Sequence, residues 1–232
     1  MNFMNYRKAV FLDLDGTILD TESVYMKLML KYNKAYGEKI SKHFYLKNFI
    51  GRTKNEISNI LRQKWGVEYI EDNYWAGLLK LKTDYFNKNK VRVKYGFYNL
   101  INYLKINEWC IAIVTSNSYC QVKDLLNRAK IDEKIFDFII TRDDVEKVKP
   151  AKDLYLYAKR KLGIESNFIF AVEDSDVGLR AAQDSNIKTI YVKDICKIDK
   201  AIQDKCYGFA KTLKNVIKII KRMEIYEYNK TK

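Results

Sequence analysis

The stretch VFLDLDGTILD, residues 10–20, begins as an apolar run and then places Asp13 and Asp15 two residues apart. Its Val, Phe, Leu and Ile content predicts a buried strand, but carboxylates are seldom fully buried without a partner. We therefore expect a strand of a central sheet, with a compensating cation just beyond the point where the strand ends.

Short apolar segments alternate with helical ones along the rest of the chain. Strands are predicted at residues 8–15, 109–115, 136–141, 167–174 and 188–194. Helices are predicted at residues 97–106, 119–130, 152–163 and 176–186, with Gly163 and Asn186 as C-terminal caps. Nearly continuous apolar strands separated by helices are typical of an α/β fold with a doubly wound, mainly parallel, Rossmann-like sheet.

Residues 20–90 follow a different pattern. Apolar side chains recur at helical spacing, as at Val24, Leu28 and Tyr32, and no convincing strand is present. Asp20 or Thr21 can cap the first of these helices. We expect an inserted α-helical cap domain at residues 20–90 and a core domain formed by residues 1–19 and 91–232.

The composition excludes several classes of protein. The 232 residues are 47% hydrophobic and 31% charged, which suits a globular domain, and no run of eighteen apolar residues suggests a membrane span. The N-terminus lacks the pattern of a secretory signal, so we expect a cytoplasmic protein. The four cysteines lack the spacing of a zinc site, and Cys110 lies in an apolar run typical of a core residue.

The formal net charge of +14 raises the possibility of a nucleic-acid partner. The lysines are spread along the whole chain without an arginine-rich block, which favours a general surface field over a dedicated nucleic-acid site. Such a field attracts anionic small molecules to a cleft. We expect no nucleic-acid partner and no membrane partner.

Polar residues gather where the predicted strands end. Asp13 and Asp15 end the first strand, residues 115–117 the second and residues 173–174 the fourth, and Lys149 follows the third. Ligands of open α/β sheets bind beyond the carboxyl ends of the strands. Carboxylates packed together stay ionised only beside a cation, and oxygen ligands without His or Cys indicate Mg²⁺. The pattern predicts a magnesium and phosphate site at this edge.

These segments also resemble a known family. D-x-D-G-T after an apolar strand, a Thr at the end of the next, Lys149-Pro150, and E-D-S before G-x-x-A-A are similar to the haloacid dehalogenase superfamily of phosphotransferases. The helical insertion after the first motif resembles the branch with β-phosphoglucomutase and the phosphoglycolate or sugar-phosphate phosphatases. The resemblance covers nearly the whole chain.

The resemblance implies a role for each matching position. Asp13 would be the nucleophile that forms an aspartyl-phosphate, and Asp15 the general acid and then the general base. Thr115 and Ser116 would hold the phosphoryl oxygens, and Lys149 would offset charge. Mg²⁺ would be bound by the ligands Asp13, the Asp15 carbonyl, Asp174 and Glu173, the last directly or through its neighbours.

Further residues are candidates for binding the substrate. Gly16 lets the chain turn sharply and leaves room for the metal and phosphate, and Asn117 adds an amide donor at the strand end. The segment at residues 49–55 resembles the substrate-specificity loop of the family, so Arg52 or Lys54 would contact the polar body of the substrate. A solvated basic turn is the alternative interpretation of that segment.

The predicted activity is Mg²⁺-dependent hydrolysis of a small phosphorylated metabolite, a sugar phosphate or a phosphoglycolate-like ester, by a monomer or weak homo-oligomer. Asp15 argues against dehalogenation, because the similar dehalogenases lack this second aspartate. A sugar phosphomutase is the alternative, but Tyr25 stands where the mutases of this branch have a histidine. A phenol is a poor proton carrier near neutral pH. A non-catalytic basic binding protein is the remaining alternative.

Overall fold

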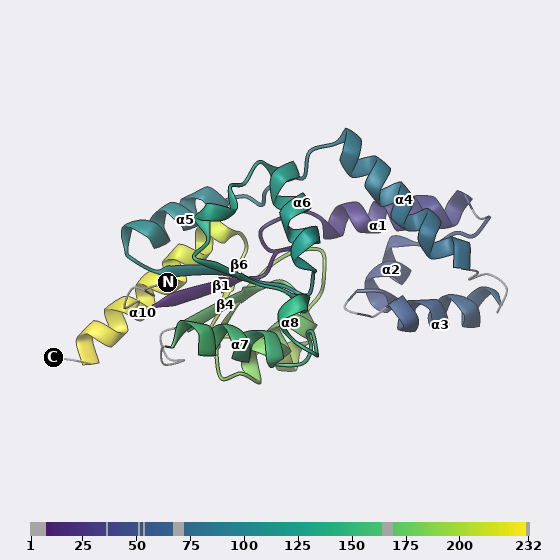
Figure 1. The fold of residues 1–232 in the computed structure, drawn as a ribbon. Helices are drawn as coiled ribbons and strands as arrows, with labels where there is room; N and C mark the ends of the chain where they lie inside the picture. The colour runs from purple at the N-terminus through teal and green to yellow at the C-terminus, as the bar shows by residue number, and fades with distance from the viewer. Residues whose placement is uncertain are drawn as a thin grey trace.

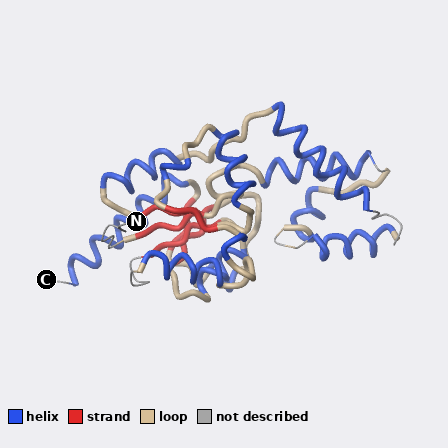
Figure 2. Tube along the Cα trace, in the orientation of Figure 1, coloured by secondary structure: helices blue, strands red, loops and turns tan. Residues whose placement is uncertain are grey.

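The computed structural model of the protein describes residues 8–35, 37–50, 52, 54–66, 72–163 and 169–230. Within these ranges the chain forms a six-stranded sheet with helices around it and a group of helices to one side (Figures 1 and 2). This arrangement confirms the predicted α/β class with a helical insertion.

All paired strands are parallel, in the order β3-β2-β1-β4-β5-β6. Their bounds are β1 Ala9–Leu12, β2 Cys110–Val114, β3 Phe138–Ile140, β4 Ile169–Glu173, β5 Lys188–Val192 and β6 Gly208–Ala210. Leu12 of β1 lies between Ile113 of β2 and Val172 of β4, so these three strands end at the same edge. Five strands confirm the predictions, although residues 167 and 168 lie outside the described ranges; β6 was not predicted.

Helices cover both faces of the sheet. They are α5 Phe97–Ile106, α6 Tyr119–Ala129, α7 Asp153–Leu162, α8 Asp176–Gln183, the short α9 Lys200–Gln203 and α10 Leu213–Lys230, with 3₁₀ turns at Glu133–Ile135 and Arg142–Asp144. Val10 and Leu12 pack in one cluster with α5, α6 and α10, whereas Ala9 and Phe11 pack in another with α7 and α8. This two-sided burial is why the strands are apolar throughout rather than alternating.

The ends of the core helices follow their capping residues. Gly163 is the C-cap of α7 with a left-handed φ of 70°, as predicted. Ser175 caps the N-terminus of α8 by accepting a hydrogen bond from the Gly178 N–H. Helix α8 ends at Gln183, and Asn186 follows with a left-handed φ of 55°. The Ile187 N–H donates to the Ala182 carbonyl at 3.1 Å, so Asn186 terminates this helix as predicted.

The insertion has its own core. Its helices are α1 Glu22–Ala35, α2 Lys42–Asn48, α3 Lys54–Trp65 and α4 Asp72–Lys88, and Figure 1 shows them beside the sheet rather than on either face. Their buried side chains form a separate cluster that includes Met26, Tyr45, Leu61, Tyr74 and Leu78. The helical character predicted for residues 20–90 is therefore confirmed where the chain is described.

Two linkers connect the insertion to the sheet domain, and they lie side by side. The Asp20 N–H donates to the Arg92 carbonyl at 2.9 Å, and the Lys94 N–H donates to the Ile18 carbonyl at 2.8 Å. Between these bonds, Leu19 and Val93 form an antiparallel bridge. The chain thus leaves and re-enters the sheet domain at one place, just beyond β1. The domain boundaries at 19/20 and 90/91 stay a prediction.

Two predictions from composition can be compared with the structure. The four cysteines are free thiols, and Cys110 is fully buried in β2. In the described part of the chain, no helix combines the length and the apolar character that a membrane span requires.

Candidate active site

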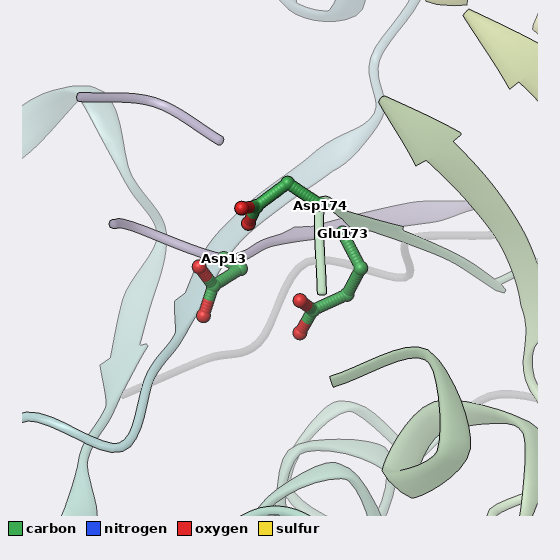
Figure 3. A group of neighbouring side chains, drawn as sticks. All are labelled: Asp13, Glu173 and Asp174. Atoms are coloured by element: carbon green, nitrogen blue, oxygen red, sulfur yellow. The ribbon is translucent and has the colours of Figure 1, made fainter. Parts of the chain in front are cut away.

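The predicted acidic residues converge at the carboxyl edge of the sheet. Asp13 directly follows β1, and Glu173 and Asp174 lie at the end of β4, the neighbouring strand. Figure 3 shows the three carboxylates turned toward a common space. One oxygen from each lies within 4.8 Å of the others, and all three residues are buried. The central expectation, that Asp13 and Asp174 could ligate one cation, is therefore met by the geometry.

Lys149 holds two of these carboxylates together. Its Nζ donates to Asp13 Oδ1 at 2.5 Å, to Glu173 Oε1 at 2.6 Å and to the Val114 carbonyl at 2.7 Å. The side chain is only 4% exposed. Burial disfavours a charged lysine, but the charges of Asp13 and Glu173 outweigh that cost and hold the pKa of Lys149 above its usual range. Lys149, which the Lys149-Pro150 motif indicated as a site residue, is therefore a cation held in place by its partners.

Glu173 is the most enclosed of the acids. Besides the bond from Lys149, its Oε1 accepts a hydrogen bond from the Tyr155 hydroxyl at 2.5 Å. Its Oε2 is buried without a hydrogen-bond partner among the described residues. Gly178 leaves the room for this carboxylate, because a Cβ there would lie 2.0 Å from Oε2. One oxygen of Glu173 therefore orients Lys149, and the other remains a potential ligand or acceptor.

The D-G-T segment shapes the site around Asp174. The Thr17 hydroxyl donates to Asp174 Oδ1 at 3.0 Å, and both residues are buried. Gly16 has a left-handed φ of 78°, and a Cβ on it would lie 2.2 Å from Asp174 Oδ2. A side chain at position 16 would strain the turn and displace the acid. The predicted sharp turn is present, and the space that it leaves is occupied by the Asp174 carboxylate.

Asp15 is set apart from the acidic cluster by its own donors. The Thr21 hydroxyl donates to its Oδ1 and the Asn117 amide to its Oδ2, both at 2.5 Å. Loss of water contact raises the pKa of Asp15; the Thr21 bond opposes the rise and the charge of Asp13 adds to it. A raised pKa favours the protonated form, and a protonated carboxyl can serve as a general acid.

The cluster carries more negative charge than Lys149 can balance. Loss of water contact and then the charge of Glu173 raise the pKa of Asp13 to about 7, although Lys149 opposes the rise. Burial, followed by the charges of Asp13 and Glu173, raises the pKa of Asp174 well above its usual range. An added cation would relieve both effects, and the all-oxygen donor set suits a hard divalent ion. The residues present therefore fit a bound Mg²⁺.

A pocket of about 220 Å³ opens over these acids. Among the predicted site residues it is lined by Asp13, Asp15, Thr115, Ser116, Asn117, Lys149 and Asp174. Thr115 is buried, and its Oγ1 accepts a hydrogen bond from the Asn117 N–H at 3.2 Å. The strand-end donors and the acids therefore share one cavity of a size suited to a phosphoryl group and a small leaving group.

The two cations predicted for the specificity loop do not line this pocket in the structure. Arg52 and Lys54 are exposed and do not line it, and the Lys54 ammonium lies 5.4 Å from the centre of the Trp75 ring. Gly51 and Thr53 of the same segment lie outside the described residues. Ile50 lines the pocket and places the start of the segment beside it.

Sequence reasoning missed several residues of the site. Tyr155 falls within the predicted helix at residues 152–163 but has no predicted site role, and no hydrogen bonds from Thr17 or Thr21 to the aspartates are predicted. The signal for Tyr155 was available, because a tyrosine on the buried face of a helix needs a partner for its hydroxyl. Glu22, which lines the pocket from the first turn of α1, was also missed; in the sequence it only marks a helix start.

Tyr25 lies on the same helix but lines a neighbouring crevice of about 340 Å³ between α4 and α6. The Lys82 ammonium sits 4.0 Å from the centre of its ring, and Phe86 contacts it edge-on. Burial, followed by the charge of Asp15, raises the pKa of the Tyr25 hydroxyl well above its usual range. This phenol is therefore a still weaker acid than the sequence alone implies.

Comparisons with known proteins agree with the site. Residues 10–192 match the haloacid dehalogenase-like hydrolase family. The chain is 24% identical over 184 residues to the phosphorylated carbohydrates phosphatase of Thermotoga maritima, a match that covers 79% of this chain and 84% of the relative. It is 25% identical over 189 residues to the bifunctional riboflavin kinase/FMN phosphatase of Arabidopsis thaliana, where it covers 82% of this chain but only 49% of the longer relative.

The fold is shared with solved structures. A haloacid dehalogenase-like protein from Agrobacterium tumefaciens superposes with a TM-score of 0.81, covering 95% of this chain and all of that chain at 18% identity. The family match extends over most of the chain, and it runs from the strand before Asp13 to the end of β5. The chain is therefore an enzyme of the haloacid dehalogenase-like hydrolase family, with a helical insertion after its first strand.

Proposed function

We propose that this enzyme is a Mg²⁺-dependent phosphatase that hydrolyses a small phosphorylated metabolite through an aspartyl-phosphate on Asp13. The observation that carries the proposal is the convergence of Asp13, Asp174 and Glu173 around one space, with Lys149 bonded to two of them. The phosphatase names of the two curated relatives support it, and the Thermotoga relative makes a sugar phosphate the first substrate class to test.

Each step of the reaction has a residue suited to it. Asp13 Oδ would attack phosphorus while the bond to the leaving oxygen breaks, and Asp15 would give that oxygen a proton. Asp15 would then take a proton from the water that hydrolyses the aspartyl-phosphate, which restores Asp13 and releases phosphate. The two side-chain donors on Asp15, Thr21 and Asn117, hold its carboxyl in a fixed orientation for both transfers.

The remaining residues bind and neutralise charge. Thr115 and Ser116 would donate to the phosphoryl oxygens, and Lys149 would offset charge between nucleophile and phosphate. Asp13 and Asp174 would hold Mg²⁺, with the Asp15 carbonyl and Glu173 as further ligands or supports. Bound Mg²⁺ supplies the positive charge that keeps the carboxylates ionised and favours the approach of a phosphate dianion. Positioning and charge neutralisation are the main requirements of phosphoryl transfer.

The insertion at residues 20–90 would act as a cap that closes over the pocket and excludes bulk water. Arg52 or Lys54 would then approach the leaving group from the cap side. A sugar phosphomutase is the weaker alternative, because the position that would relay a proton between sugar hydroxyls is Tyr25. Its hydroxyl lies in the neighbouring crevice with a raised pKa.

The test is a panel of esters assayed for phosphate release with Mg²⁺ or with EDTA. The panel contains glucose 6-phosphate, glucose 1-phosphate, ribose 5-phosphate, glycerol 3-phosphate and phosphoglycolate. We expect Mg²⁺-dependent hydrolysis of at least one ester and a loss of about a thousandfold or more in Asp13→Asn. Asp204→Asn, an exposed aspartate at the end of α9, is the matched control and should retain full activity.

Two outcomes would contradict the proposal. Equal turnover by folded Asp13→Asn would exclude the nucleophile, and isomerisation of glucose 1-phosphate to glucose 6-phosphate without phosphate release would favour the mutase. Circular dichroism of both variants establishes that they are folded before the rates are compared.

A further inference from the structure

Glu22 differs from the other acids that line the pocket. Asp13, Asp15 and Asp174 each accept a hydrogen bond from a side chain of the site. Among the described residues, Glu22 is the one pocket carboxylate that has no hydrogen bond or ion pair. It also comes from the insertion, in the first turn of α1, whereas the other three follow strands of the sheet.

The surroundings of Glu22 leave its carboxylate poorly stabilised. Withdrawal from water and repulsion by Asp15 raise the pKa of Glu22 to about 8, and the charge of Lys82 only partly opposes the rise. The Lys82 ammonium is itself held over the Tyr25 ring and lines the neighbouring crevice. A carboxyl group in this situation gains free energy from any hydrogen-bond donor that a ligand brings to it.

The position of Glu22 decides which part of a substrate can provide that donor. The phosphoryl group and the metal belong at the sheet edge, where Asp13, Asp174 and Lys149 meet. Glu22 lines the same cavity but comes from α1 of the insertion rather than from a strand end. With the phosphoryl group at the sheet edge, the leaving group extends toward the part of the lining that the insertion supplies. Phosphate oxygens carry no donor when ionised, so the donor must belong to the leaving group.

The charges of the pocket lining further limit which chemical classes of leaving group the pocket can accept. The lining contains the four carboxylates and one cation, Lys149, which is already bonded to Asp13 and Glu173. A leaving group with a second anionic group would bring that anion toward Glu22 and Asp15. Arg52 and Lys54, the cations predicted to contact the substrate, do not line the pocket in the structure. Neutral hydroxyl groups carry no such cost and donate the hydrogen bond that Glu22 lacks.

We propose that Glu22 selects the leaving group, accepting a hydrogen bond from a hydroxyl of a neutral sugar or polyol and disfavouring leaving groups with a second anion. The inference rests on the proposed phosphatase function and assigns a specificity-determining residue to it.

The experiment compares three esters in each variant. Glycerol 3-phosphate and n-propyl phosphate have three-carbon leaving groups that differ only in two hydroxyl groups, and phosphoglycolate carries a carboxylate instead. The measured quantity is the ratio of kcat/KM values between two esters in one protein preparation, which cancels any loss of folded enzyme. The variants are Glu22→Ala, the nearly isosteric Glu22→Gln, and Asp84→Asn as an exposed acid of the insertion.

At pH 9, above the raised pKa of Glu22, the carboxylate is ionised. There we expect Glu22→Ala to lower the glycerol 3-phosphate to n-propyl phosphate ratio by about tenfold, the loss of one hydrogen bond to a charged acceptor. Glu22→Gln keeps an acceptor oxygen and should lower the ratio less, while raising the phosphoglycolate to glycerol 3-phosphate ratio because the charge is gone. Asp84→Asn should leave both ratios as in the wild type.

The outcomes that overturn the inference are distinct from those that overturn the phosphatase. If the wild type hydrolyses these esters and both Glu22 variants keep the wild-type ratios within about twofold, Glu22 does not determine the preference between leaving groups. If the wild type releases no phosphate from these three esters or from any ester of the panel above with Mg²⁺, the phosphatase proposal fails and the inference fails with it. A wild type that hydrolyses phosphoglycolate in preference to glycerol 3-phosphate overturns the inference alone.

Discussion

The carboxylates on the two sides of the pocket differ in whether protein side chains donate hydrogen bonds to them. Lys149, Thr17 and Asn117 of the sheet domain, with Thr21 at the start of the insertion, supply donors to the aspartates at the sheet edge before any ligand arrives. On the insertion side, none of the residues that the structure describes donates a hydrogen bond to Glu22. The sheet side is therefore preorganised for a reaction that is the same for every phosphate ester, whereas the insertion side is completed by the particular substrate.

The largest expected difference in unfolding free energy is between removing the cation of a buried ion pair on the sheet side and removing that of an exposed ion pair on the insertion. Lys149→Met leaves Asp13 and Glu173 without their cation, and removing one partner of a buried pair costs about 3–5 kcal/mol of unfolding free energy. Catalytic activity should be lost as well. Urea unfolding without Mg²⁺ and the phosphatase assay measure the two losses.

The matched control is Lys80→Met on α4, where Lys80 pairs with Asp84 at 2.7 Å on the surface. Exposed pairs contribute little, so the change should stay within about 1 kcal/mol and activity should be retained. Similar unfolding free energies for the two variants would show that the sheet-side cation is not the structural anchor that its contacts indicate.

A smaller effect is expected from adding one methyl group on each side. Gly178→Ala places a Cβ 2.0 Å from Glu173 Oε2, an oxygen of a carboxylate that Lys149 and Tyr155 hold in place. Overpacking of this kind costs about 1–3 kcal/mol, and displacement of Glu173 should lower kcat. Thermal unfolding and steady-state kinetics measure both.

Gly77→Ala in α4 is the corresponding change in the insertion. Its Cβ would lie 2.0 Å from the Tyr32 hydroxyl, the far end of a partly buried side chain that can turn aside. Alanine also favours the helix over glycine by about 1 kcal/mol. We expect little net change in the unfolding free energy. A loss equal to that of Gly178→Ala would show that the surroundings of Tyr32 in the insertion adapt no more easily than those of Glu173.

The smallest expected loss of unfolding free energy comes from removing one buried hydroxyl group on each side. Thr17→Val removes the donor to Asp174 Oδ1, and Ser58→Ala removes the acceptor of the Trp75 indole N–H at 2.9 Å. Each should lower the unfolding free energy by about 1 kcal/mol. Only Thr17→Val should also lower activity, by about tenfold, because it loosens a predicted metal ligand. Equal activity of the two variants would remove Thr17 from the site.

Much of the sheet edge could be predicted because strand ends and polar residues coincide in the sequence. Continuous apolar runs locate β1 to β5, and the residues that follow β1, β2 and β4 had to meet once those strands were parallel neighbours. β6 was missed because Gly208–Ala210 is short and only Ala210 is buried. A three-residue edge strand leaves almost no pattern of its own.

The insertion side could be predicted only as helices. Helical spacing locates apolar faces, but it does not say which polar residue of a first turn will face a cavity formed with another domain. Glu22 therefore has no site signal in the sequence, and the predicted contact of Arg52 or Lys54 with the substrate stays a prediction, because neither residue lines the pocket. Orientation between two packed units depends on contacts that no local pattern encodes.

The side-by-side linkers at Leu19 and Val93 have a consequence for how this protein can vary. The chain leaves and re-enters the sheet domain at neighbouring points. The length and shape of the insertion between them can therefore change without altering the order of the strands. A short turn joining the two linkers would keep the carboxylates of the sheet edge but remove Glu22 and the Thr21 donor to Asp15.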